Sequence, residues 1–152
     1  MLNLRPHPEG GYYREIFRSA AFVQPLDPRQ PRVALTTIYF LLPAGDVSRW
    51  HRVASDEVWH FYEGDPLELL TIDAATVDVE RYLLGGVGQD SRPVHAVSAG
   101  VWQAARTTGA YTLVGCSVAP GFDFTDFQML RDIPEESSKV KPHLGDALEM
   151  FL

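Results

Sequence analysis

The sequence predicts an all-β protein, folded as an antiparallel sandwich or barrel. Short runs rich in β-branched and aromatic residues follow one another along most of the chain. Gly, Pro and Asp separate these runs at intervals of roughly 8–12 residues, which is the spacing of antiparallel β-architectures. Signals for helix are confined to the C-terminal end.

The expected elements follow in chain order. The first strand is expected at Tyr12–Ser19. The next segment, Gln24–Arg32, has three prolines and is expected to be an exposed loop, because proline cannot donate within a central strand. Further strands are expected at Thr36–Pro43, Asp46–Val53, Glu57–Gly64, Leu67–Asp73, Thr76–Leu84, Val101–Arg106, Ala110–Pro120 and Phe122–Leu130. Short helical segments are expected at Pro134–Ser138 and Asp146–Leu152.

The length of 152 residues predicts one domain, residues 1–152, with a barrel core at about 10–131 and a C-terminal tail at 132–152. The net charge of -7 and the scattered basic residues disfavour a nucleic-acid or membrane-surface partner. A small molecule or a protein is the expected partner. The only cysteine, Cys116, is expected to be a buried, inert thiol. With no signal-peptide pattern and no long apolar run, a cytoplasmic location is expected.

The chain contains a motif that resembles the first cupin motif, G-x5-H-x-H-x3/4-E-x6-G. Five residues have this spacing: Gly45, His51, Val53, Glu57 and Gly64. Val53 departs from the motif, because the family usually has a second histidine there. The second cupin motif survives only as a remnant around Gly100, with Ser98 at its proline and Gln103 in place of its last metal-binding histidine.

The chain also resembles one branch of that superfamily, DUF985 or cupin type 5. The matching segments cover most of Pro6 to Leu130: "HPEGGYYRE", "TTIYFLL", "SRWHRVASDEVWHFYEGDPLEL" and "LVGCSVAPGFDFTDFQML". The resemblance implies a double-stranded β-helix (a cupin jelly-roll barrel), a pocket inside the barrel and a homodimer. It implies no settled activity.

Strand alternation predicts which of these side chains share the barrel interior. Arg49, His51 and Val53 lie on one face of their strand, and Glu57, Trp59 and Phe61 alternate in the same way after the loop. The opposite faces are rich in aromatic residues and are expected under the N-terminal strand or at a dimer interface. They carry Trp50, His60, Tyr62 and Trp102.

The leading functional expectation is small-molecule binding in the barrel, with isomerase or epimerase chemistry on a sugar-like or anionic substrate. His51 is the expected base and Glu57 its orienting or acid partner. The expected substrate contacts are Arg49, Trp59, Phe61, Gln103, Tyr12 and Tyr39, with Tyr62 as a further possible hydroxyl donor. Glu9 and Tyr12 join the site if the N-terminal segment folds over the barrel mouth.

Two other functions remain open. A divalent transition metal held by His51, Glu57 and Gln103 would make the chain a metal-dependent oxygenase or isomerase, although an amide oxygen is a weak ligand. Alternatively, the barrel is a binding or storage module without chemistry. In that case His51 and Glu57 form a structural pair.

Overall fold

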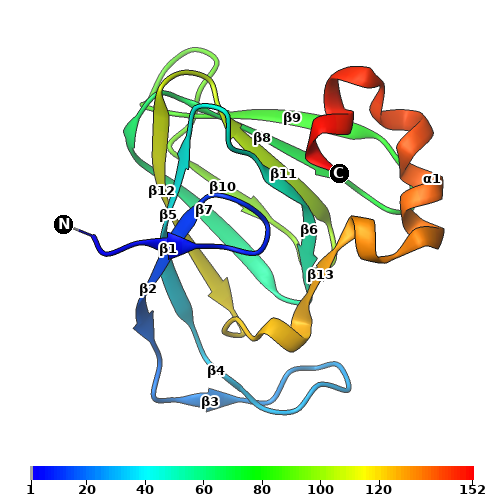
Figure 1. The fold of residues 1–152 in the computed structure, drawn as a ribbon. Helices are drawn as coiled ribbons and strands as arrows, with labels where there is room; N and C mark the ends of the chain where they lie inside the picture. The colour runs from blue at the N-terminus through cyan, green and yellow to red at the C-terminus, as the bar shows by residue number, and fades with distance from the viewer. Residues whose placement is uncertain (1) are drawn as a thin grey trace.

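The computed structural model describes residues 2–152 and consists mainly of two antiparallel sheets that face each other (Figure 1). The larger sheet has six strands in the order β1 (Arg5–Pro6), β2 (Tyr12–Arg18), β5 (Thr36–Pro43), β12 (Tyr111–Ala119), β7 (Asp56–Gly64) and β10 (Val94–Val97). The smaller sheet has five strands in the order β13 (Phe127–Met129), β6 (Ser48–Val53), β11 (Trp102–Thr107), β8 (Leu67–Ile72) and β9 (Val79–Leu84).

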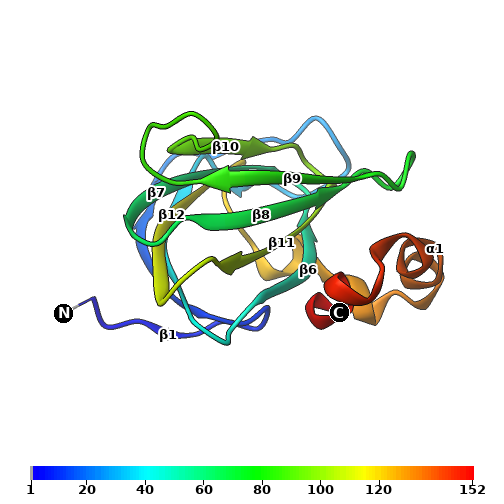
Figure 2. The ribbon, with the colours of Figure 1, turned by 90° about the horizontal axis from the view of Figure 1, so that it is seen from above.

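Neighbouring strands in each sheet come from distant parts of the chain. In the larger sheet β12 lies between β5 and β7, and in the smaller sheet β11 lies between β6 and β8. The chain therefore crosses repeatedly between the sheets, and both sheets curve around a common interior (Figure 2). The predicted all-β fold is confirmed, and this strand order is the one expected of a double-stranded β-helix.

Several segments differ from the expected elements. Strand β10 was not expected, and the expected helical segment Pro134–Ser138 extends to Leu144. Strand Phe122–Leu130 was expected, but Phe124–Asp126 forms a 3-10 turn, η1, and only β13 pairs with the smaller sheet. The reason is local, because the carboxylate of Asp123 accepts the backbone N–H of Thr125 at 2.9 Å and caps the turn. The expected loop is flanked by two short paired strands, β3 (Phe22–Val23) and β4 (Arg32–Val33).

The C-terminal segment covers the outer face of the smaller sheet. It contains the short turn η2 (Leu130–Asp132), the helix α1 (Pro134–Leu144) and the turn η3 (Asp146–Phe151). Figure 2 shows this segment beside β6. Proline at the start of α1 and two acidic residues in its first turn favour a helix at this point. Within residues 2–152, no helix has the length and apolar character needed to cross a membrane.

The aromatic outer face was expected to meet the N-terminal strand or a second copy. For two of its members, Trp50 and Trp102, the structure corrects this expectation. Both indoles are buried against the chain's own C-terminal segment. The indole N–H of Trp102 donates to Glu136 of α1 at 3.0 Å, and Arg52 forms an ion pair with the same carboxylate. Tyr62 lies on the other sheet, where it is 47% exposed.

The interior between the sheets is apolar at one end and hollow at the other. Along β5, Phe40 and Leu42 belong to the apolar cluster, whereas Thr36 and Ile38 line a cavity. Strand β7 makes the same transition, since Trp59 is part of the cluster and Glu57 faces the cavity. The packed cluster therefore forms the floor on which the polar site rests.

Candidate functional site

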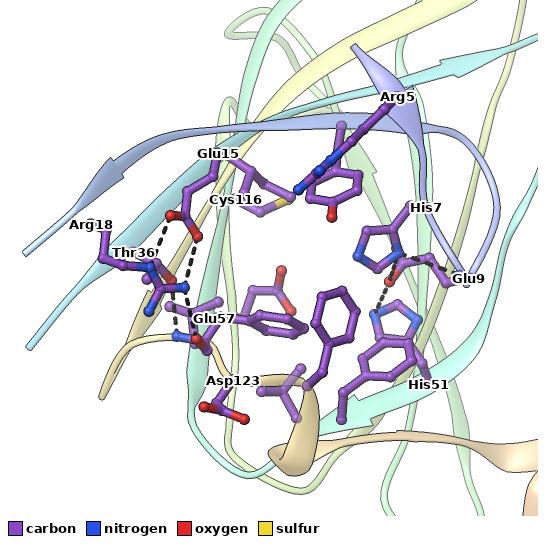
Figure 3. A pocket seen from close by; sticks show the side chains of 17 residues that line it. Arg5, His7, Glu9, Glu15, Arg18, Thr36, His51, Glu57, Cys116 and Asp123 are labelled. Atoms are coloured by element: carbon purple, nitrogen blue, oxygen red, sulfur yellow. Dashed lines mark hydrogen bonds and ion pairs between the residues drawn. The ribbon is translucent and has the colours of Figure 1, made fainter. Parts of the chain in front are cut away.

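The cavity has a volume of about 410 Å³, and Figure 3 shows the side chains that line it. Strands β6 and β7 contribute His51 and Glu57 to its lining, and both side chains are buried. The structure thus brings together the two residues that the cupin-like motif singled out. The volume lies within the ordinary range of small-ligand pockets.

The His51 ring is held in one orientation. Its Nδ1 atom lies 2.7 Å from the carbonyl oxygen of Arg49, which can only accept, so Nδ1 carries the proton and donates. Phe127 stacks on the ring at 5.5 Å between centroids. Burial lowers the pKa of His51, which keeps the imidazole neutral. Its Nε2 atom is therefore a hydrogen-bond acceptor.

The carboxyl group of Glu9 lies beside the Nε2 atom of His51. Its Oε2 atom lies 3.3 Å from Nε2 of His51 and 3.2 Å from Nδ1 of His7. The hydroxyl of Ser48 donates to Oε1 of Glu9 at 2.7 Å. Burial raises the pKa of Glu9 to about 8, so the carboxyl is mostly protonated at neutral pH and its proton faces two imidazoles.

A tight N-terminal turn brings Glu9 to the cavity. The backbone N–H of Arg49 donates to the carbonyl of Glu9 at 2.8 Å, and β1 pairs with β2 beyond the turn. At Gly10, where φ is 112°, a Cβ atom would lie 2.0 Å from the carbonyl oxygen of Val47. Only glycine permits this approach, so the "HPEGG" stretch is both a turn and part of the site.

Glu57 is oriented by a chain of hydrogen bonds from the apolar cluster. The indole N–H of Trp59 donates to Oε1 of Gln103 at 2.9 Å, and the amide nitrogen of Gln103 donates to Glu57. Cys116 lines the same cavity. Burial raises the pKa of Glu57 to about 6 and raises that of Cys116 as well, so the carboxyl is mostly ionised and the thiol neutral at pH 7.

The cupin-like metal position does not fit a transition metal in this chain. Val53 presents an apolar side chain to the cavity, and the amide oxygen of Gln103 is already used by Trp59. Among residues 2–152, no group of three or more His, Cys, Asp or Glu side chains is arranged to hold a metal ion. Transition-metal sites need imidazole, thiolate or carboxylate donors, and neither Val53 nor Gln103 supplies one.

Several residues expected at the site lie away from the cavity. Gln103 and Trp59 are behind Glu57 rather than at the surface of the cavity. Arg49 and Tyr12 line a separate surface recess, and Tyr39 packs edge-to-face against Tyr62 with ring centroids 6.1 Å apart. Phe61 is also not among the described residues that line the cavity.

Residues that the sequence reasoning did not place at the site form much of the cavity wall. Arg5, His7 and Tyr13 come from the N-terminal segment, and three aromatic rings come from the connection before and within β13: Phe122, Phe124 and Phe127. The Phe124 ring stacks on His7, with centroids 6.0 Å apart. This wall shields the imidazoles from water.

Two curved antiparallel sheets that enclose a polar cavity with these motif residues define a double-stranded β-helix protein. The family described as Cupin superfamily (DUF985) matches residues 1–130, and the chain belongs to this family. The resemblance inferred from the sequence motifs is therefore confirmed.

Solved structures support the same assignment. A hypothetical protein from Leishmania major is 34% identical, with a TM-score of 0.78 and 93% of each chain covered. A protein from Shewanella oneidensis is 33% identical, with a TM-score of 0.76 and coverage of 93% of this chain and 90% of that one.

A more distant likeness shows the fold alone. Oxalate decarboxylase from Bacillus subtilis is 14% identical, with a TM-score of 0.61 and coverage of 86% of this chain and 31% of that enzyme. The fold is thus shared with an enzyme. No curated protein matched the chain.

Proposed function

We propose that this protein binds a small organic molecule in the barrel cavity and catalyses proton transfer on it, as an isomerase or epimerase acting on a sugar-like carbonyl compound. One observation supports this most strongly. Two buried carboxyl groups, Glu9 and Glu57, line the same cavity but have different hydrogen-bond partners. Environments that separate the pKa values of two neighbouring acids divide the roles of acid and base between them.

Glu57 is the proposed base and Glu9 the proposed acid. The ionised Glu57 takes a proton from the carbon next to the substrate carbonyl, and the electrons of that C–H bond form a C=C bond. The C=O π electrons move to oxygen, which takes the proton of Glu9 and yields an enediol. If Glu57 returns its proton to the former carbonyl carbon while Glu9 takes the proton of the other hydroxyl, a C=O bond forms at the neighbouring carbon and the product is an isomer. If the proton returns to the opposite face of the original carbon while Glu9 recovers its proton from the enediol oxygen, the product is an epimer.

This assignment gives His51 a different part from the base role expected from sequence. Both ring nitrogens of His51 already have partners, Nδ1 at the Arg49 carbonyl and Nε2 at Glu9. His51 therefore acts as a positioning residue that holds the Glu9 carboxyl in place. Gln103 has the corresponding positioning role for Glu57.

Solvent deuterium exchange tests the proposal without knowledge of the product. The protein is incubated in D2O with a panel of aldoses, ketoses and uronates, and incorporation at carbon is followed by mass spectrometry. We expect exchange into at least one compound, its loss in Glu57→Gln and its retention in Glu63→Gln, a change of an exposed glutamate on the same strand.

The other two functions predict different results. Exchange that stops on addition of a chelator would favour the metal-dependent enzyme. Absence of exchange in every compound, together with ligand-dependent thermal stabilisation, would contradict the proposal and indicate a binding module.

A further inference from the structure

The cavity mouth carries a cationic side chain that the proposed proton transfer does not use. Arg5 on β1 lines the cavity, and its side chain reaches inward (Figure 3). The guanidinium lies over the Tyr13 ring, 5.0 Å from its centroid. Because Arg5 and Tyr13 are paired residues of neighbouring strands, the backbone holds the two side chains together.

The charge of Arg5 is available to a ligand. Within residues 2–152, no carboxylate forms an ion pair with Arg5, whereas the other arginine of the lining, Arg18, is paired with Glu15 at 2.8 Å. The acidic Asp123 lies across the mouth from Arg5 and accepts hydrogen bonds from Thr125 (Figure 3). The mouth therefore has one unpaired guanidinium, a group that matches planar or tetrahedral oxyanions.

The remaining walls limit the size and shape of the ligand. The volume of about 410 Å³ equals the space of about 14 water molecules at ~30 Å³ each, enough for a single monosaccharide-sized compound. Aromatic rings form one wall, with Phe122 and Phe124 edge-to-face at 4.9 Å between centroids. Such a wall contacts the C–H face of a sugar or a flat ring.

We propose that the ligand of this cavity is a small organic oxyanion, a carboxylate or phosphate of monosaccharide size, whose anionic group is bound by Arg5 at the mouth. This inference rests on the proposed function, because the opposite end of the same ligand would meet Glu57 and Glu9. Arg5 thus takes the anion-binding part that the sequence had suggested for Arg49, whose guanidinium lies outside the cavity.

Three matched sugars test this directly. Glucose, glucuronate and glucose 6-phosphate share a ring and differ in the group at one carbon, and their dissociation constants can be measured by calorimetry. We expect at least one of the two anions to bind about tenfold or more tightly than glucose. The anion that binds more tightly distinguishes a carboxylate from a phosphate ligand.

Variants assign the preference to Arg5. Arg5→Gln should abolish it, and Arg5→Lys should retain only part of it, because lysine keeps the charge but not the two-pronged geometry. Arg14→Gln, with the same change in net charge on β2 but outside the cavity lining, should keep the full preference. Equal binding of glucose and both anions, no binding of any sugar, or a preference that survives Arg5→Gln would overturn the inference.

The result is separable from that for the proton chemistry. Glu57→Gln should lose deuterium exchange but keep the anion preference, because Arg5 is unchanged. Exchange without an anion preference overturns this inference alone, and a preference without exchange overturns the proposed chemistry alone.

Discussion

The carboxyl group of Glu9 lies 3.3 Å from Nε2 of His51, and this contact joins the N-terminal turn to β6 of the smaller sheet. A carboxyl buried there without its proton would face apolar walls at high cost. Protonated, it has an acceptor in each neighbouring imidazole. The pairing therefore holds a proton beside the cavity that Glu57 also lines.

The dependence of turnover on pH should be bell-shaped. Activity requires an ionised Glu57 and a protonated Glu9. It should therefore rise with pH through the Glu57 pKa of about 6 and fall through the Glu9 pKa of about 8. Glu9→Gln should lower the rate and remove the alkaline limb. Rates of deuterium exchange across this range provide the measurement, and an alkaline limb that persists in Glu9→Gln would exclude Glu9 as the acid.

Replacing Gln103 by leucine should lower the free energy of unfolding and also shift the pH dependence of activity. The change leaves the buried indole N–H of Trp59 without its acceptor, at a cost of about 1–3 kcal/mol in the free energy of unfolding. It also removes a hydrogen bond that lowers the pKa of Glu57, so the acidic limb should move to higher pH. Urea denaturation and exchange rates measure the two effects.

The control for that variant is Gln128→Leu. Gln128 is exposed on β13, and its side-chain oxygen Oε1 accepts a hydrogen bond from the guanidinium of Arg52. This change should alter stability by less than about 0.5 kcal/mol and leave the profile in place. If Gln103→Leu behaves like this control, then the hydrogen-bond chain to Glu57 has no role in the site.

The stability of the protein should fall as pH rises from about 6.5 to about 8. In the unfolded chain Glu9 ionises near its ordinary value of 4.5, whereas in the fold it keeps its proton until about 8. The unfolded state therefore binds fewer protons in this window, and stability falls by up to about 1.4 kcal/mol per pH unit.

Glu9→Gln should flatten that fall, because an amide does not ionise. The window begins at pH 6.5, the ordinary pKa of histidine. The pKa of the buried His7 is lowered to about 3, so His7 reduces stability only below pH 6.5, where the unfolded chain binds a proton that the fold does not. Denaturant midpoints measured across the window should show a shallower slope in the variant. Equal slopes in the two proteins would mean that Glu9 is ionised in the fold.

We propose that the protein forms a homodimer, as its family resemblance led us to expect. The outer face of the smaller sheet is covered, but the larger sheet exposes apolar side chains on its outer side, including Phe17, Tyr62 and Val94. Light scattering at micromolar concentration should give twice the 17.0 kDa chain mass, and Val94→Arg should lower it. A monomeric wild-type protein would contradict the proposal.

The fold could be predicted largely from local patterns. Turn spacing and strand alternation placed His51 and Glu57 on the inner face of the barrel, because His51–Val53 pair in register with β13 and Glu57–His60 pair in register with β10. The register of β6 shifts between Ser48 and His51, so alternation did not place Arg49 in the same way. The 3-10 turn at Phe124–Asp126 was not predicted, since its aromatic residues have the composition of a strand and only the Asp123 cap interrupts it.

The site was only partly accessible from sequence. Strand alternation placed Trp59 correctly on the inner side but could not show whether cavity or packed core lies there, because that depends on how the two sheets fill their interior. The contributions of Arg5 and His7 depend on the N-terminal turn crossing the barrel mouth. The paired glycines of "HPEGG" were the available signal. They indicated a turn but did not show that the turn crosses the barrel mouth.

The proposed proton transfer requires that Glu9 holds a proton at a pH where Glu57 has lost one. Carbon-13 NMR of the glutamate carboxyl groups, with Glu9→Gln and Glu57→Gln to assign the signals, measures both titrations in the intact protein. We expect Glu57 to titrate near 6 and Glu9 near 8, both above the ordinary 4.5. A Glu9 signal that titrates at or below that of Glu57 would contradict the proposed proton transfer, because Glu9 could not then supply the proton.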